Sequence, residues 1–300
     1  MEFPVSDSVL TPPSAPLDPQ TITSQSGSSF LAGFVCLSKP RRYAMTVIYA
    51  FCRVVDDAVD DAPDAATGAR HLDFWRQELH RCEGGRPDTP VGRALQGVIV
   101  DFGVPISALD DLVSGCAMDL DTGGIADLAE LELYCYRVAS AVGLACLPVL
   151  GATSSGAQKF AQALGQALQF TNVLRDLRSD AEIGRCYVPK TWLDEFGATA
   201  DDLLGEGHSG LYAPGGGVAR LCERLASISR KQFAEAYAEL RKLPLRERRS
   251  LVSPRIMGAI YGDLLRGLEQ RLGHVAGERL RVTRGRKLML ALLVWLGVRT

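Results

Sequence analysis

Apolar residues recur at helical spacing through most of the chain, whereas the strict alternation of a half-buried strand is scarce. The longest helical patterns cover 40–61, 127–151, 154–179, 216–242 and 255–273. Pro63 stands just beyond the first of them, where it would stop a helix. No internal repeat of fixed period occurs. The sequence therefore predicts an all-α protein.

Two regions depart from this pattern. The first 25 residues are rich in Pro, Ser and Thr and have no basic segment followed by an apolar one. They predict a flexible arm over 1–25 rather than a secretory signal. The Gly-rich stretch 205–217 is too short for an interdomain linker and predicts a surface loop. Residues 26–300 are therefore expected to form a single domain.

Composition narrows the class of protein. A net charge of -2 with 47% apolar residues is ordinary for a globular protein and gives no reason to expect a nucleic-acid partner. The eight cysteines include no C-x-x-C pair and do not cluster with the four histidines. This usage predicts neither a zinc site nor a disulfide framework, and it favours a reducing cytoplasm.

An acidic stripe is predicted on the helix that covers 40–61. Asp56 and Asp60 are four residues apart, so they share one face of that helix. The same face continues back through Arg53 and Tyr49, while the opposite face is apolar. Two carboxylates without compensating partners repel each other, so this face is expected to bind a cation.

A second stripe is predicted on the helix that ends near 179. Gln169, Asn172, Asp176 and Asp180 follow one another at steps of three, four and four residues. All four offer oxygen atoms, and none is a histidine or cysteine. Such a set favours a hard cation such as Mg²⁺, which usually completes its coordination with waters and phosphate oxygens.

A single acidic run is more often just a solvated helix face. Two acidic runs, each flanked by arginine and tyrosine, instead favour a binding site. Arg175, Arg185 and Tyr187 supply donors that suit phosphate oxygens. The combination predicts a diphosphate held by bridging Mg²⁺ between two facing helices.

Five segments carry a family resemblance, and they occur in order: SGSSFLAGF, YAFCRVVDDAVDD, AMDLDT, YCYRVASAVG and QFTNVLRDLRSDAEIGRCYVP. From about Ser26 to Leu296 the chain resembles the squalene and phytoene synthases, which join prenyl diphosphates head to head. Within that family it looks most like the presqualene diphosphate synthases of the bacterial hopanoid pathway. The resemblance implies an isoprenoid synthase helical bundle around a central substrate cavity.

The resemblance also implies roles for individual residues. The expected metal ligands are Asp56, Asp60, Asn172, Asp176 and Asp180. The expected substrate contacts are Ser29, Phe30, Phe34, Tyr49, Arg53, Gln169, Arg175, Arg185, Tyr187 and Tyr261. The expected catalytic residues are Tyr134, near the reacting centre, together with Arg53 and Arg175.

The reaction that the resemblance implies is an Mg²⁺-dependent condensation of two farnesyl diphosphates to presqualene diphosphate. Phytoene or dehydrosqualene synthesis, or squalene synthesis with NADPH, would use the same motifs and stays open. A non-catalytic helical assembly protein is the alternative from another class, but such a protein should have lost the aspartate motifs. The proton acceptor, either released diphosphate or a tyrosine such as Tyr134, also stays open.

The C-terminal segment has two readings of equal weight. The basic residues of RLRVTRGRK precede the apolar run LMLALLVWLGV, 288–298, which is too short to span a bilayer. The run either rests on an anionic membrane surface or packs on the core as a last helix. We therefore expect a cytoplasmic protein, peripheral to the inner face of the membrane if the first reading holds, with downstream pathway enzymes as partners.

Overall fold

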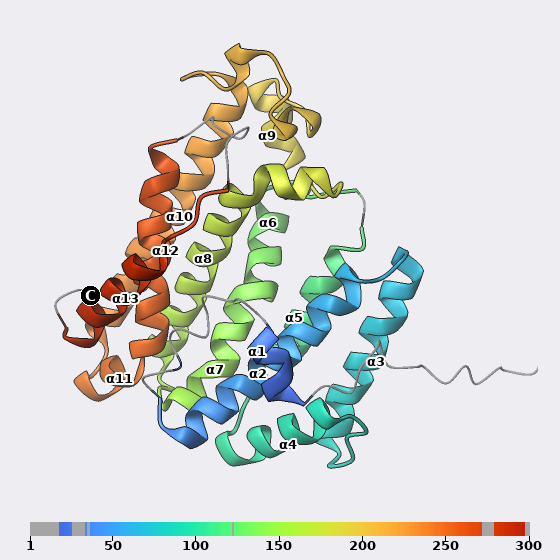
Figure 1. The fold of residues 1–300 in the computed structure, drawn as a ribbon, viewed down its shortest axis with the longest axis vertical. Coiled ribbons are helices and arrows are strands. Elements are labelled where there is room, and N and C mark those ends of the chain that lie inside the picture. The colour runs from blue at the N-terminus through green and yellow to red at the C-terminus, as the bar shows by residue number, and fades with distance from the viewer. Residues whose placement is uncertain (1–17, 26–33, 35–36, 122, 272–278, 298–300) are drawn as a thin grey trace, which may run out of the picture.

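The computed structural model describes residues 18–25, 34, 37–121, 123–271 and 279–297 (Figure 1). Every regular element in these ranges is a helix, which confirms the predicted all-α class. The elements are α1 (Pro19–Gln25), α2 (Lys39–Asp60), α3 (Ala65–Glu83), α4 (Pro90–Phe102), α5 (Ile106–Met118), α6 (Leu128–Cys135), η2 (Tyr136–Ser140), α7 (Ala141–Leu150), α8 (Ser155–Glu182), α9 (Lys190–Phe196), η3 (Asp201–Leu204), η4 (Ser209–Leu211), α10 (Gly217–Lys242), α11 (Leu245–Ser250), α12 (Val252–Glu269) and α13 (Arg284–Trp295).

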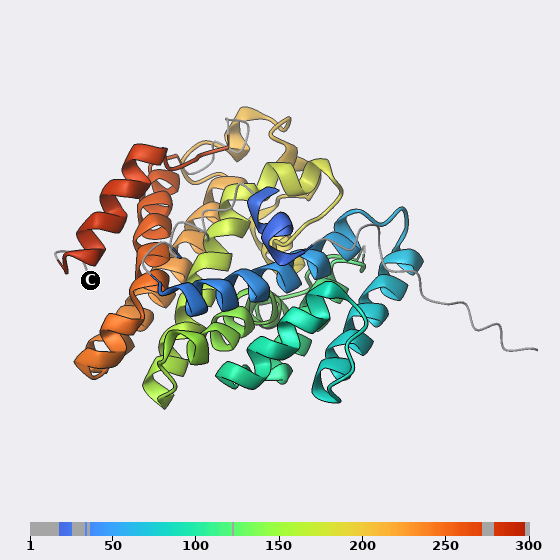
Figure 2. The ribbon, with the colours of Figure 1, turned by 60° about the horizontal axis from the view of Figure 1, so that its bottom comes forward.

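The helices form a bundle with α8 near its centre. On one side α8 packs against α10, and on the other it packs against α7 and the short element η2. Helix α3 lies at one edge of the bundle and α13 at the opposite edge in both views (Figures 1 and 2). The two helices that carry the acidic stripes, α2 and α8, thus belong to the interior of the molecule.

Local signals explain where these two helices begin and end. Ser38 precedes α2 in an extended conformation and a proline occupies its first turn, while α2 ends three residues before Pro63. The hydroxyl of Ser154 caps α8 by accepting a hydrogen bond from the amide of Ala157 at 3.2 Å. The apolar faces of both helices are buried in one core, so the polar stripes are held on the remaining faces.

A π-helical turn, η2, interrupts the long helical stretch from α6 to α7. Two neighbouring helices, α8 and α5, approach this turn closely at glycine residues. A Cβ on Gly165 of α8 would lie 2.5 Å from the Cα of Ser140, and a Cβ on Gly115 of α5 would lie 2.8 Å from the Cβ of Arg137. The Ser140 hydroxyl also donates to the carbonyl of Gln162 at 2.7 Å. Such turns are frequent at functional sites.

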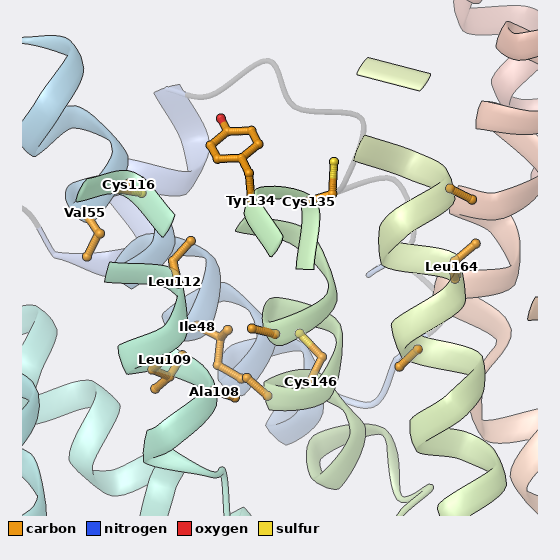
Figure 3. Packing of buried hydrophobic residues seen from close by; sticks show 14 of the residues in the cluster. Ile48, Val55, Ala108, Leu109, Leu112, Cys116, Tyr134, Cys135, Cys146 and Leu164 are labelled. Atoms are coloured by element: carbon orange, nitrogen blue, oxygen red, sulfur yellow. The ribbon is translucent and has the colours of Figure 1, made fainter. Parts of the chain in front are cut away.

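The consequence of this packing is the position of Tyr134, which lies on α6 just before the π-helical turn. Figure 3 shows its side chain above the buried residues of α2, α5 and α7, among them Ile48, Leu112 and Cys146. The stretch 128–150 is long and apolar enough to span a membrane by length and composition, but half of that window is buried, as in an ordinary core helix.

The N-terminal prediction needs a correction. Residues 19–25, placed in a flexible arm over 1–25, form helix α1, which packs on α2. Ile22 is buried there, and the Thr23 hydroxyl donates to the carbonyl of Pro19 at 2.7 Å. Composition indicated mobility because a helix this short depends on a partner surface that sequence pattern does not reveal. The cysteines within the described residues are all free.

The close contact at Gly165 predicts a loss of stability on adding a methyl group. Gly165→Ala should lower the free energy of unfolding by about 1–3 kcal/mol, because the backbone of Ser140 must move. Gly97→Ala is the matched control: Gly97 lies inside α4 with open space around it, so the same change should stabilise by about 0.5–1 kcal/mol. Urea unfolding measures both, and equal effects would contradict the packing described.

Candidate active site

The α2 stripe is neutralised in part by arginine. Arg53 donates to Asp56 at 3.3 Å and to Asp57 at 3.1 Å, both within one turn. Asp60 pairs with Arg185, which comes from the segment after α8, at 2.8 Å. The expectation that Asp56 and Asp60 lack compensating partners is therefore wrong, because guanidinium groups approach both.

The first half of the α8 stripe is a pair of amides. The Asn172 side chain donates from Nδ2 to Oε1 of Gln169 at 3.2 Å. The oxygen of the same amide, Asn172 Oδ1, is buried and has no hydrogen-bond partner among the described residues. A buried carbonyl oxygen left in this state is costly unless a ligand or water reaches it.

The second half of the α8 stripe contains the two aspartates. Asp176 binds Arg175, and it also accepts two hydrogen bonds from Arg279 at 2.6 and 2.8 Å. Burial favours the protonated form of Asp176, but the two arginines outweigh it and lower its pKa. Arg279 was missed by sequence reasoning, which treated 279–287 only as a basic segment near the C-terminus.

A salt bridge between Arg185 and Asp60 joins the segment after α8 to the C-terminal end of α2, and the backbone amide of Arg185 donates to the carbonyl of Asp180 at 2.9 Å. Two residues beyond Arg185, the hydroxyl of Tyr187 donates to Asp119 at 2.7 Å. The Tyr134 ring stacks on that of Tyr187, with centroids 4.8 Å apart and planes at 21°. The structure therefore brings the α2 stripe, the segment 185–187 and Tyr134 together.

Asp119 is a second residue that sequence reasoning missed. It lies directly after α5, where its other oxygen is 3.5 Å from the Tyr134 hydroxyl. Burial raises the pKa of Asp119, although the bonds from Tyr187 and the charge of Arg185 oppose the shift. The signal was available, because Asp119 lies within the segment AMDLDT on which the family resemblance partly rests.

Burial and like charges raise two pKa values in the site. Burial and the neighbouring Asp60 raise the pKa of Asp56 to about 6, even though Arg53 opposes the shift. Burial and the neighbouring Asp176 raise the pKa of Asp180 to about 7. Each stripe thus holds one carboxyl group whose negative charge the protein alone does not fully stabilise.

These residues fit Mg²⁺. Within the described ranges, no three or more His, Cys, Asp or Glu side chains converge to hold one metal ion. The expected ligands therefore do not form a closed cage of carboxylates. Mg²⁺ usually needs only one or two carboxylates, with phosphates and waters filling the other positions. The free Oδ1 of Asn172 and the raised pKa values of Asp56 and Asp180 mark oxygen atoms that a cation would stabilise.

The remaining predicted residues lie around this centre or outside it. The side chain of Tyr261, on α12, interacts with the Arg175 guanidinium. Tyr49 lies half-buried on α2, one turn before Arg53. Phe34 is buried in the main core. Ser29 and Phe30 lie outside the described residues, so their contacts stay predictions.

Comparison with known proteins identifies the family. The chain belongs to the squalene/phytoene synthase family, whose sequence profile matches residues 23–286. It is 34% identical over 269 residues to the presqualene diphosphate synthase of Rhodopseudomonas palustris, spanning 89% of this chain and 92% of that protein. The presqualene diphosphate synthase of Zymomonas mobilis is 36% identical over 251 residues, 82% of this chain and 81% of its own. A phytoene synthase of Mycobacterium tuberculosis is 33% identical over 243 residues, 81% and 78% of the two chains.

Solved structures agree with this assignment. A dehydrosqualene synthase crystallised with a ligand superposes with a TM-score of 0.78 at 27% identity, covering 93% of this chain and 95% of that one. A squalene synthase from Alicyclobacillus acidocaldarius gives a TM-score of 0.72 at 28% identity, covering 85% and 93%. The helical bundle expected from the resemblance is therefore confirmed as the fold of this family.

The raised pKa values predict that Mg²⁺ binding depends on pH. Both folded-state pKa values exceed the usual 3.8, so in the metal-free protein these two carboxyl groups contribute stability when they are protonated. That contribution to stability is lost as pH rises from about 4 through about 7. Mg²⁺ needs the ionised forms. The increase in melting temperature on adding Mg²⁺ should therefore be larger at about pH 8 than at about pH 5.5.

A double variant, Asp56→Asn with Asp180→Asn, provides the control for this measurement. It keeps the size of both side chains but removes both titrating groups, so most of the Mg²⁺-induced shift and its pH dependence should disappear. An equal shift in the unmodified protein at both pH values would contradict the assignment.

The contacts of Asp119 predict unequal effects for the two tyrosines. Tyr187→Phe should lower the free energy of unfolding by about 1.5–3 kcal/mol, because it removes a 2.7 Å hydrogen bond to a carboxylate. Tyr134→Phe should cost less, since its hydroxyl is 3.5 Å from the same group. Chemical denaturation compares them, and a larger loss for Tyr134→Phe would show that Asp119 is organised differently.

Proposed function

We propose that this protein, a prenyltransferase of the squalene/phytoene synthase family, condenses two molecules of farnesyl diphosphate head to head into presqualene diphosphate. One diphosphate is released. The observation that carries the proposal is the link that Arg185 makes between the two acidic stripes, through its salt bridge to Asp60 and its backbone hydrogen bond to Asp180, with Arg53 and Arg175 on the stripes themselves. The likeness to presqualene diphosphate synthases over most of both chains supports the choice of product.

Arginine side chains carry the first step in this proposal. As the bond between the first farnesyl group and its diphosphate breaks, Arg53, Arg175 and Arg185 stabilise the negative charge that gathers on the leaving group. Contacts with carboxylates and tyrosines outweigh burial and raise the pKa values of Arg175 and Arg185, so both stay charged. Mg²⁺ held by Asp56, Asp60, Asn172, Asp176 and Asp180 would neutralise further charge on the diphosphate.

The second step joins the two chains. The 2,3-double bond of the second farnesyl diphosphate attacks the allylic cation, and loss of a proton closes the cyclopropane ring. Burial and the nearby Asp119 raise the pKa values of Tyr134 and Tyr187, so both phenols are neutral near pH 7 and are poor bases. We therefore favour released diphosphate as the proton acceptor, with Tyr134 facing the cation.

The cation must be protected from water. We propose that the farnesyl chains lie against half-buried apolar residues of the central helices, among them Val138, Val142 and Leu168. The depth of the space that these residues leave determines which prenyl chain fits.

We place the enzyme in the cytoplasm, peripheral to the inner face of the membrane through its C-terminal segment. Its substrate is amphiphilic and its product carries two prenyl chains, so the enzymes that consume this product are its expected neighbours. Nucleic acid is not among the expected partners.

Product analysis tests the function. Purified protein with farnesyl diphosphate and Mg²⁺ should release presqualene diphosphate and diphosphate, and adding NADPH should leave the product unchanged. Squalene formed only with NADPH would contradict the product assignment. The likeness to phytoene synthases makes geranylgeranyl diphosphate the necessary comparison, and a preference for it with phytoene as product would favour that alternative.

Substitution of the aspartates tests whether the two stripes act in the reaction. Asp56→Ala and Asp176→Ala should each lower Mg²⁺-dependent diphosphate release at least about 100-fold, because each removes charge that the leaving group depends on. Circular dichroism serves as the control, since the helical spectrum should persist. Release unchanged by either substitution would favour the non-catalytic assembly protein.

A further inference from the structure

Helix α13 is amphipathic, and among the residues that the structure describes only one of its faces is covered. Leu290 and Val294 are buried against Ile256 and Ile260 of α12. This contact confirms the reading of a last helix packed on the core, but it buries just two of the apolar residues of α13, Leu290 and Val294. Five others, Leu288, Met289, Leu292, Trp295 and Leu296, have between 40% and 73% of their surface exposed.

The exposed residues form one stripe. Positions 288, 292, 295 and 296 follow helical spacing, and 289 extends the stripe by one position, so the five lie on the side of α13 opposite Leu290 and Val294. Exposed leucines occur singly on most proteins, but a contiguous stripe that includes a tryptophan usually marks an interaction surface.

Positive charge borders this stripe. The segment 279–297 contains five arginines and lysines and no aspartate or glutamate. Arg281 and Arg284 are exposed and form no ion pair within the described residues. Arg279 and Arg286 are committed to Asp176 and Asp263 respectively, which leaves Arg281 and Arg284 to meet an external anion.

Helix α11 adds to the same edge of the molecule. Figures 1 and 2 both place α11 and α13 at this edge. Leu245, Arg246 and Arg249 of α11 are exposed. Helices α12 and α13 share one buried cluster, and α11 directly precedes α12 and packs on it, so both exposed surfaces belong to helices that pack on α12.

We infer that the outer face of α13, together with α11, is a docking surface for a lipid bilayer with anionic headgroups. Leu288, Leu292 and Trp295 enter the boundary between headgroups and acyl chains, while Arg281, Arg284, Arg246 and Arg249 contact lipid phosphates. Tryptophan suits this position because its ring is apolar and its indole N–H finds a polar partner at the interface.

Charge decides between a bilayer and a second copy of the chain. A symmetric dimer through this stripe would bring the arginines of both copies close together without acidic partners. An anionic bilayer supplies the opposite charge. The surface is also connected to the reaction site, because Arg279, bound to Asp176, precedes α13 by five residues. The docking itself does not depend on the reaction proposed above.

Vesicle flotation of the intact protein tests the inference. Binding to phosphatidylcholine vesicles that contain phosphatidylglycerol should exceed binding to pure phosphatidylcholine, and high salt should weaken it. Trp295 provides a direct optical signal. Trp75 and Trp192 are buried, whereas 63% of Trp295 is exposed, so the anionic vesicles should shift its emission to shorter wavelength, and Trp295→Phe should abolish that shift.

Surface variants separate the two parts of the docking surface. Leu288→Ser with Leu292→Ser should weaken vesicle binding roughly tenfold or more, because two exposed leucines no longer enter the bilayer. Arg281→Gln with Arg284→Gln, and Arg246→Gln with Arg249→Gln, should each weaken it by about fivefold for every arginine removed. Val100→Ser, on the exposed surface of α4, and Arg70→Gln, on α3, are the matched controls and should bind as the unmodified protein does.

Two results would overturn the inference. One is vesicle binding that is absent, or that the α13 and α11 variants leave unchanged. The other is a dimer in sedimentation without vesicles that Leu288→Ser with Leu292→Ser dissociates, which would assign the stripe to a second copy. Presqualene diphosphate formation from dispersed substrate is measured in parallel and should be the same in these variants, so a failure of docking is distinguishable from a failure of the proposed reaction.

Discussion

On each of the helices α2 and α8, two carboxylate groups are partly buried beside each other, and the repulsion within each pair is the constraint on which the site depends. Three arginines reduce this repulsion. They are Arg53 on α2, Arg175 on α8 and Arg185 in the segment that follows α8. The compensation is incomplete, since burial and neighbouring carboxylates still raise the pKa values of Asp56 and Asp180. A site with this excess of negative charge favours the binding of metal cations together with the diphosphate group of a substrate.

The hydrocarbon side of the site depends on close helix packing rather than on charge. Gly115 and Gly165 let α5 and α8 approach the π-helical turn from both sides, which fixes the preceding turn and with it Tyr134. Asp119 then links Tyr134 to Tyr187, two residues from Arg185. The aromatic pair and the diphosphate donors are therefore parts of one arrangement, and a change in the packing at either glycine should reach the tyrosines.

Sequence pattern was sufficient for the helical class and for the α2 and α8 stripes, because both follow from periodicity within one helix. It failed where partners come from distant segments. Arg279 reaches Asp176 across about a hundred positions of chain, and helix α1 is stable through its contact with α2, so neither has a local signal. Asp119 was within reach, since it lies in a quoted motif, but its role depends on where Tyr134 and Tyr187 meet. The choice among products still rests on likeness to relatives.

The central claim is that the two stripes are halves of one site. Calorimetric titration of inorganic diphosphate in the presence of Mg²⁺ tests it most directly, using Asp56→Ala, Asp180→Ala and the double variant. If both aspartates serve one bound diphosphate, the loss of binding free energy in the double variant will differ from the sum of the single losses by more than about 1 kcal/mol. Losses that add to within about 0.5 kcal/mol would show two independent sites and contradict the account.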